Sequence, residues 1–510
     1  DHFFYGLAYL TRTAKRPEVL VIGPGGGVDV ENALHFDASR VTAVEINPTM
    51  LEIVREEYGA FSAHGREHAV YEFPQVEPVV SEGRAWLRRT SERFDIIQMT
   101  GTDTYAALAS GAYVFSESYL YTVEAFREYL EHLEEEGTVA VLRFRFEPAR
   151  ESLKLAATAA AALREAGVER PGDHVVVINI TIPLGPEHRE IFRIDRIRYA
   201  VTLTRKRPWR AEEIETYRRW IARSQESIQD PARSLGFYAQ FGYAPAAGGG
   251  KAEGAGEYLD FFSALEAGET AAFHRRYPYD VAPVGDDRPF FFKFHKWSAV
   301  LGSGKQEKID YEGLAGRDPI GLRILLSLLL LTTAAVLLLV LLPLAFLRRG
   351  AAGPQKLRVF VYFFGIGLGF IFAEVASLQR FVLFLGHPTY SLTVVLFGFL
   401  FFMGVGSLLS QRLRLRSNLP SRVALGGVLF FLLLHVLFLP AIFRSCLHLP
   451  DAGRMALAAA CLAPLAFCMG FAFPTGMRIT NGIAPRLVPW AWGVNGAASV
   501  TGSVGAIILA

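Results

Sequence analysis

The first 205 residues alternate between short apolar runs and amphipathic stretches. Short apolar runs, bounded by glycine and polar residues, predict strands buried on both faces, as in a parallel sheet. The stretches between them have the spacing of helices, and further helices are expected at 151–166 and 210–224. The expected strands are 19–22, 41–44, 78–80, 94–99, 137–142, 174–181 and 198–204. The pattern therefore predicts a doubly wound α/β domain with a seven-stranded sheet.

From residue 321 the pattern changes to long apolar runs separated by short basic loops. Each run reaches the roughly 20 residues that cross the hydrocarbon of a bilayer. Gly365 and Gly369 give one run a face of small residues, and the last run is rich in glycine, alanine and serine, so we expect tight helix packing. The expected spans are 322–347, 359–379, 389–409, 423–443, 454–474 and 490–510. The sequence thus predicts a domain at 1–205, a helical and irregular extension at 206–320, and about six transmembrane helices at 321–510.

Composition supports this division. The mean hydropathy of +0.25 is high for a chain with 20% charged residues, because it averages a soluble part and an apolar part. The net charge of +2 gives no basic excess for binding nucleic acid. The three cysteines, Cys446, Cys461 and Cys468, lie in the apolar part without the spacing of a metal or disulfide site. The chain starts at Asp1 within a helical pattern and without an initiator methionine, so we expect further sequence upstream.

A glycine-rich turn and a following acid mark the first candidate site. The first expected strand runs into Gly23-Pro-Gly-Gly-Gly27, a helix begins near Asp29, and the second strand ends at Glu45. Glycine lets the backbone approach a ligand closely, and a carboxylate at that strand end can accept hydrogen bonds from ribose hydroxyls. A dinucleotide fingerprint would need glycine at position 28, where the chain has valine. The spacing favours a nucleoside of the adenosyl-sulfonium class; the alternative is a glycine-rich turn of another α/β protein.

Two more polar segments follow expected strands. Glu82-Gly83 stands where this cofactor class often bonds the adenine amino group, although a helix cap explains the acid equally well. Thr100-Gly-Thr-Asp103-Thr-Tyr105 follows the fourth strand and should face the glycine turn, with Asp103 as candidate base and Tyr105 as a residue shaping the pocket. The residues expected at the cofactor are Gly23, Gly25, Gly26, Gly27, Asp29, Glu45, Ile46, Glu82, Gly83 and Thr100.

Polar residues also interrupt the apolar half. Glu374 lies inside an expected span, and Arg380 and His387 follow at its edge. A carboxylate at the centre of a bilayer costs about 2.5–3.5 kcal/mol on insertion scales, so Glu374 requires an explanation. The functional hypothesis is a polar substrate or proton site between helices; the alternative is a structural pair or a water-exposed turn.

Two features concern the membrane surface. The aromatic motifs at 277–280 and 286–292 are expected in a connector near that surface, because the interface favours such rings. Six simple crossings place the basic loops 348–358, 410–422 and 475–489 opposite the soluble part, which the positive-inside rule would then put outside the cytoplasm. An adenosyl-sulfonium donor is made in the cytoplasm, so on chemical grounds we expect the soluble part to face the cytoplasm.

These motifs support a resemblance to a known family. Residues 1 to about 205 resemble the spermidine synthase family of aminopropyltransferases, which share the Rossmann-like fold of adenosylmethionine-dependent methyltransferases. The whole chain resembles bacterial membrane-bound spermidine synthase-like proteins. The matching motifs are Gly-Pro-Gly-Gly-Gly27, Glu45-Ile-Asn47, Glu82-Gly83, Phe94-Asp-Ile-Ile97 with Asp103, Asp286-Asp-Arg-Pro289, Gly369-Phe-Ile-Phe-Ala-Glu374, Leu385-Gly-His-Pro-Thr-Tyr390 and Pro489-Trp-Ala-Trp-Gly-Val-Asn495.

The resemblance implies a location, a donor and residue roles. It implies an integral protein of the bacterial plasma (inner) membrane, with the lipid bilayer as a partner and no metal. The donor would be S-adenosylmethionine or decarboxylated S-adenosylmethionine, and methylthioadenosine the product of the latter. By the same likeness Glu45 would hold the ribose, Glu82 the adenine, and Asp103 would lie beside the reacting amine.

The chain departs from the family pattern in three places. The acid that follows the glycine run in true aminopropyltransferases is Val28, the Asp-Ser-Ser-Asp-Pro loop is Thr100-Gly-Thr-Asp103-Thr104, and a Tyr-His-Glu cluster is replaced by Phe3-Phe4-Tyr5. A polyamine acceptor needs carboxylates to pair with its charges, so the departures argue against putrescine.

The sequence leaves three hypotheses. One is a membrane-tethered transferase, and another is a catalytically silent nucleoside-binding module that regulates or stabilises a transporter-like helical domain. A third is a structural subunit in which both sites are relics. The acceptor and the oligomeric state, a homo-oligomer included, stay open.

Overall fold

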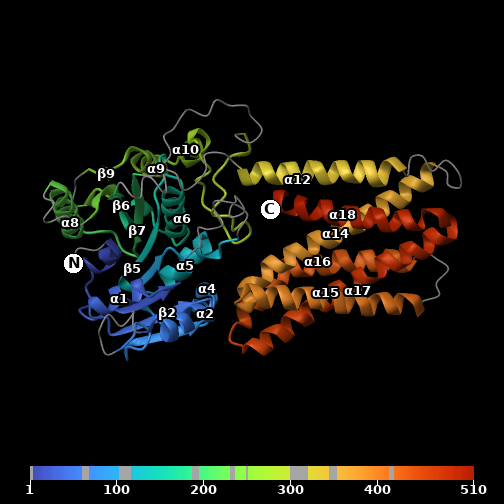
Figure 1. The fold of residues 1–510 in the computed structure, drawn as a ribbon, viewed down its shortest axis with the longest axis horizontal. Coiled ribbons are helices and arrows are strands. Elements are labelled where there is room, and N and C mark those ends of the chain that lie inside the picture. The colour runs from blue at the N-terminus through green and yellow to red at the C-terminus, as the bar shows by residue number, and fades with distance from the viewer. Residues whose placement is uncertain are drawn as a thin grey trace. The chain divides into compact units, whose positions relative to one another are not determined.

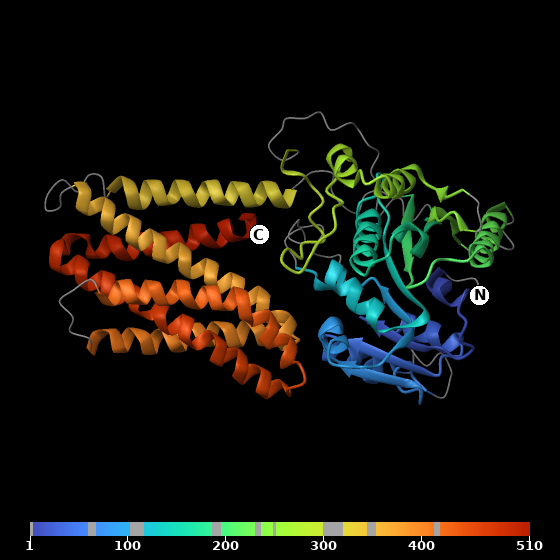
Figure 2. The same cartoon turned by 180° about the vertical axis from the view of Figure 1, so that it is seen from behind.

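The computed structural model describes residues 4–59, 68–102, 117–185, 195–229, 236–247, 251–298, 320–343, 353–412 and 419–509. The chain divides into two compact units, Asp1–Leu322 and Arg323–Ala510. In Figures 1 and 2 the first unit runs from blue to green and yellow and contains the sheet, while the second consists of yellow to red helices.

The sheet of the first unit has nine strands in the order β3-β2-β1-β4-β5-β7-β6-β8-β9. The strands β3, β2, β1, β4 and β5 are parallel, and the remaining four add antiparallel. Their bounds are β1 (Glu18–Ile22), β2 (Arg40–Glu45), β3 (Val76–Val80), β4 (Phe94–Thr100), β5 (Leu133–Phe144), β6 (Val175–Pro183), β7 (Arg196–Thr204), β8 (Tyr238–Ala244) and β9 (Glu253–Gly254). The prediction of seven strands is wrong, because β8 pairs with β6 and β9 pairs with β8 beyond the expected end of the domain.

Helices cover both faces of this sheet. Successive residues of a strand alternate between two buried clusters: Leu20 and Ile22 contribute to one, and Val19 and Val21 to the other. The α-helices are α1 (Val28–His35), α2 (Pro48–Glu52), α4 (Gly83–Leu87), α5 (Val123–Glu131), α6 (Glu151–Glu165), α8 (Ala211–Gln229), α9 (Gly256–Glu266) and α10 (Thr270–Arg276). Short 3-10 and π turns are η1 (Phe4–Tyr9), η2 (Ile53–Glu57), η5 (Tyr119–Tyr121) and η6 (Pro171–His174). Burial on both faces explains why the central strands read as continuous apolar runs.

The aromatic motif at 286–292 belongs to the core of the first unit. Phe290, Phe291 and Phe292 are 7%, 0% and 1% exposed, and the last two join the same cluster as Leu20. The interpretation of these rings as an interfacial belt is therefore wrong. Their side chains are removed from solvent by contact with the domain itself, and an aromatic run carries the same sequence signal in either environment.

The second unit is a set of long apolar helices. They are α12 (Ile320–Val336), α14 (Gly353–Leu385), α15 (Pro388–Arg412), α16 (Leu419–Ser445), α17 (Asp451–Ile483) and α18 (Val488–Leu509), with the short turns η9 (Leu337–Leu341) and η10 (Pro485–Leu487). Of the described helices, five are long and apolar enough to cross a membrane, and α18 is not among them. The sixth expected span, 490–510, corresponds to the helix α18.

Close packing in this unit depends on glycines other than the expected ones. No atom of the described part of the chain lies within 4 Å of a Cβ built on Gly365 or Gly369, so the prediction of a packing face there is wrong within this part. A Cβ on Gly367 would instead lie 2.7 Å from the carbonyl oxygen of Asn495 in α18. Two residues along a helix correspond to about 200°, which turns Gly365 and Gly369 away from the contact. A Cβ on Gly406 of α15 would approach the Phe467 carbonyl of α17 in the same way.

Candidate functional site

The glycine turn lies at the carboxyl end of β1, between β2 and β4. Gly23, Gly25 and Gly27 have φ angles of 68°, 50° and 93°, in the left-handed region that favours glycine. The N–H of Gly27 donates to the carbonyl of Pro24 at 2.8 Å and closes the turn from which α1 begins. Among the described residues, no atom lies within 4 Å of a Cβ built on Gly25 or Gly26, so these residues leave the backbone open on that side. In the order β3-β2-β1-β4-β5 this is the switch point where doubly wound sheets bind ligands.

The carboxylate of Glu45 faces this turn from the end of β2. One oxygen accepts from the N–H of Gly25 at 3.2 Å, and the other accepts from the N–H of Asn47 at 2.9 Å. Glu45 is 7% exposed, so its position is set by the two backbone contacts. The hydroxyl of Tyr71 donates to the Gly25 carbonyl at 2.5 Å and holds the turn from outside. Tyr71 was not among the predicted residues, because its segment has no repeating pattern that would place it at the turn.

Exposed apolar side chains surround the same strand ends. Val28 and Val80 are 52% and 55% exposed, and Ile46 and Met50 are 37% and 36% exposed. Val80 pairs in register with Glu45 across β2 and β3, and Ile46 follows Glu45 directly. Apolar side chains left exposed beside a polar turn are typical of a ligand surface. These exposed apolar side chains and the Glu45 carboxylate therefore lie at the same strand ends.

Asp29 lies beneath the turn and does not line it. It is 3% exposed, and one of its oxygens accepts from the Gln98 amide at 2.7 Å. Burial raises the pKa of the Asp29 carboxyl to about 7, although hydrogen bonds from Thr100 and Gln98 lower it. Thr100, the last residue of β4, therefore contacts this core carboxyl. Val28, the residue between the glycine turn and Asp29, is 52% exposed.

Glu82 caps the helix that follows β3. Its carboxylate oxygens accept from the N–H groups of Arg84 and Ala85, at 3.1 and 2.6 Å. Burial raises the pKa of this carboxyl, and the two backbone N–H groups lower it. Gly83 is required by packing, because a Cβ there would lie 2.3 Å from the Cγ2 of Ile22. The helix-cap interpretation of Glu82 thus describes its contacts within the chain.

Asp103 and Tyr105 lie outside the described residues, and Thr102 is the last residue described before them. Its hydroxyl is 2.6 Å from the hydroxyl of Tyr121, and a Cβ on Gly23 would lie 2.7 Å from its Cγ2. Arg143 donates to the Tyr121 oxygen at 3.0 Å and pairs with Glu151, both side chains being 0% exposed. Thr102 therefore joins the glycine turn to a buried network of polar side chains.

The three polar residues of the second unit do not form one cluster. Glu374 is half-buried in α14, and Arg380 is exposed on the same helix. Six residues separate them, which corresponds to about 9 Å along the axis and to different faces. His387 stands between α14 and α15, where its Nδ1 accepts from the N–H of Thr389 at 3.1 Å.

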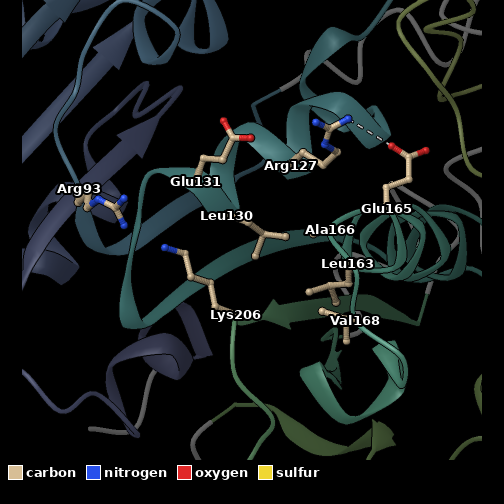
Figure 3. A pocket seen from close by; sticks show the side chains of 9 residues that line it. All are labelled: Arg93, Arg127, Leu130, Glu131, Leu163, Glu165, Ala166, Val168 and Lys206. Carbon is tan, nitrogen blue, oxygen red and sulfur yellow. Dashed lines mark hydrogen bonds and ion pairs between the residues drawn. The ribbon is translucent and has the colours of Figure 1, made fainter.

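A cavity of about 470 Å³ lies elsewhere on the first unit (Figure 3). Arg93 precedes β4, and Lys206 follows the antiparallel strand β7, so the cavity is at the amino edge of the parallel strands, opposite the glycine turn. Its walls carry both acids and bases, and Arg127 pairs with Glu165 at 3.4 Å. Its lining residues are Arg93, Arg127, Leu130, Glu131, Leu163, Glu165, Ala166, Val168 and Lys206.

The strand order and the parallel half of the sheet place the first unit among the doubly wound, Rossmann-like α/β folds. No protein-family model matches the chain. The chain is 32% identical over 102 residues to polyamine aminopropyltransferase 1 of Pseudomonas aeruginosa, covering 20% of this chain and 33% of that protein. It is 31% identical over 120 residues to the polyamine aminopropyltransferase of Thermococcus onnurineus, covering 23% and 37%. The chain therefore spans about a third of the length of these relatives.

Solved structures of two enzyme classes were also found. Spermidine synthase from Thermotoga maritima has a TM-score of 0.28 and 17% identity, with 42% of this chain and 60% of that chain covered. The adenosylmethionine-dependent methyltransferase from Agrobacterium tumefaciens has a TM-score of 0.28 and 13% identity, with 40% and 60% covered.

Proposed function

We propose that the first unit binds the adenosine part of S-adenosylmethionine or of its decarboxylated form and transfers a methyl or aminopropyl group. The observation that carries the proposal is the Glu45 carboxylate, which faces an open glycine turn at the switch point of the sheet. Two further features support the fit. The exposed side chains of Val28, Ile46 and Val80 suit a base, and Tyr71 fixes the turn.

The proposed reaction is a displacement at a carbon bonded to the donor sulfur. A nucleophile of the acceptor forms a bond to that carbon, the carbon–sulfur bond breaks with its electron pair moving to sulfur, and the nucleophile releases a proton. The sulfonium supplies the electrophile, so the protein has to orient the two partners and take up the proton. Asp103 is the proposed base and Tyr105 a proposed pocket residue, on the family resemblance and their place after β4.

The proposed acceptor is not putrescine. The resemblance implies a donor-binding acid directly after the glycine run, where this chain has the apolar Val28. The next residue, Asp29, is buried and accepts a hydrogen bond from Gln98. Beyond Thr102 and Tyr121, the buried carboxylate of Glu151 already pairs with Arg143, so this pair offers no net negative charge to a polyamine. An acceptor with little positive charge fits these surroundings.

A titration tests the proposal. The purified full chain in nanodiscs is titrated with methylthioadenosine and with S-adenosylmethionine, and we expect binding of at least one. Replacing Glu45→Gln should weaken it about tenfold or more, because a charged acceptor of ribose hydrogen bonds is lost. Glu18→Gln is the matched control, since Glu18 is an exposed carboxylate at the other end of the same strand pair. If neither nucleoside gives binding heat or a thermal shift, the proposal is refuted.

The second candidate function is a silent nucleoside-binding module attached to a transporter-like helical domain. Glu374 favours it, because the carboxylate lies within a helix apolar enough to cross a membrane. The two functions predict opposite results in cells that depend on this protein. Asp103→Asn abolishes function if the chain is a transferase, whereas Glu374→Gln abolishes it if the helical domain carries the activity.

We also propose that the chain is embedded in the plasma membrane with the first unit in the cytoplasm. The five apolar helices support the first part, and the cytoplasmic origin of the donor supports the second. A protease site inserted between residues 247 and 251 tests the orientation. Cleavage in inverted vesicles but not in intact spheroplasts is expected, and the reverse pattern would place the unit outside.

A further inference from the structure

A buried guanidinium joins the helix of Glu82 to a segment far away in the sequence. Arg84 is 0% exposed and binds the carboxylate of Glu128 in a two-pronged contact, at 2.7 and 2.9 Å. It binds the carboxylate of Asp286 in the same way, at 2.5 and 2.8 Å. Asp286 is 202 residues further along the chain. Burial alone would lower the pKa of Arg84, but the contacts with the two carboxylates hold it well above its usual value.

Residues 284–292, here called the strap, lie against residues 118–124, which lead into the first turn of α5. The carbonyls of Val284 and Pro289 accept from the N–H groups of Val123 and Ser118, at 2.9 and 2.8 Å. The N–H of Asp286 donates to Glu124 at 3.0 Å. The hydroxyl of Thr122 donates to Asp286 at 2.7 Å. These hydrogen bonds hold Asp286 in position independently of its contact with Arg84.

The other end of the strap contacts the residues that support Thr102. The guanidinium of Arg143 lies 5.0 Å from the ring centre of Phe292, and the ring centre of Phe291 lies 4.8 Å from that of Tyr121. Arg143 and Tyr121 are the residues through which Thr102 is held against the glycine turn. The strap therefore contacts the supports of both Glu82 and Thr102.

We infer that the strap is part of the nucleoside site and that Asp286 is a positioning residue for Glu82. The inference rests on the proposed function. Arg84 is two residues after Glu82 in the chain, and its N–H is one of the two donors that orient the Glu82 carboxylate. Holding the Arg84 side chain with Asp286 therefore holds the first turn of α4, and with it the acceptor that would meet the amino group of adenine.

The preference for adenine over hypoxanthine shows whether Asp286 positions Glu82 or only stabilises the fold. The full chain in nanodiscs is titrated with methylthioadenosine and with methylthioinosine, which has a carbonyl in place of the amino group. A carboxylate aimed at that group should favour the adenine compound by about tenfold or more. Asp286→Asn places an amide N–H₂ against Arg84 and should displace the start of α4. The ratio of the affinity for methylthioadenosine to that for methylthioinosine should therefore fall toward one. Glu82→Gln should reduce it as well.

A matched control uses another buried arginine. Arg205 is 0% exposed and pairs with Glu213 at 2.7 Å, at the amino edge of the parallel strands. Glu213→Gln disturbs a similar pair and should lower stability while leaving the ratio unchanged. If Asp286→Asn shows no cooperative unfolding transition, Asp286→Ala removes the same acceptors without placing a donor against Arg84.

The outcomes separate the inference from the function it rests on. A wild-type chain that binds neither compound refutes the proposed function. A wild-type chain that discriminates, together with a folded Asp286 variant that keeps the full ratio, overturns the inference alone. Loss of the ratio in Glu213→Gln as well would also overturn it, since discrimination would then follow general stability.

Discussion

Replacing Asp29→Asn should remove a pH-dependent loss of stability from the first unit. Burial raises the pKa of Asp29 from 3.8 to about 7 in the folded chain. Between these two values the folded chain holds a proton that the unfolded chain has released, so stability falls as the pH rises through this window. The difference of about three pH units corresponds to a loss of about 4 kcal/mol at most. Asparagine keeps an oxygen for the Gln98 amide and does not ionise.

Thermal unfolding of the full chain in nanodiscs measures the effect. At pH 4.5 the wild-type and Asp29→Asn chains should unfold at similar temperatures, and at pH 8 the variant should unfold several degrees higher. Binding of methylthioadenosine should be unaltered in the variant, since Asp29 lies under the turn. A variant that is destabilised equally at both pH values would refute the argument from burial. A variant that loses nucleoside binding would show that Asp29 is a ligand after all.

Three further substitutions test packing and buried charge. Gly83→Ala places a Cβ 2.3 Å from Ile22 and should cost about 1–3 kcal/mol in chemical denaturation, with Gly26→Ala, whose Cβ meets open space, as control. Glu151→Ala removes the buried carboxylate that pairs with Arg143 at 3.0 Å and should cost about 3–5 kcal/mol, whereas an unchanged unfolding midpoint would contradict the contribution of this pair. Gly367→Ala should loosen the contact of α14 with α18 and increase hydrogen exchange there, while Gly369→Ala should not.

The parallel half of the sheet could be predicted because each of its strands contains an apolar run that can be recognised locally in the sequence. The apolar runs at 19–22 and 41–44 became β1 and β2 to within a residue at each end. Their continuity follows from burial on two faces, and the glycines after β1 follow from the left-handed backbone they adopt. The pairing of β8 with β6 has no comparable local signal. The apolar pattern of β8 is interrupted by Gln240 and Gly242, and β9 has only two residues.

The rotation of the helices in the second unit could not be predicted for a related reason. Small residues recur along α14, and only the position of α18 selects Gly367 over Gly365 and Gly369 as the contact. When a helix is apolar on all sides, its sequence does not indicate which side faces the other helices, because lipid and protein neighbours accept similar side chains. The aromatic residues of the strap were misassigned in the same way, since a ring suits both a core and a membrane interface.

Glu82 shows how a residue can satisfy two hypotheses that the sequence left open. Its carboxylate caps α4, which explains an acid before a helix without any ligand. A carboxylate has about four acceptor positions, however, and the two backbone N–H groups occupy only part of them. The cap also fixes the direction in which the remaining lone pairs point, and the contact between Arg84 and Asp286 holds the cap in place. Capping and ligand binding are therefore compatible, and the capped carboxylate is the better preorganised acceptor for an amino group.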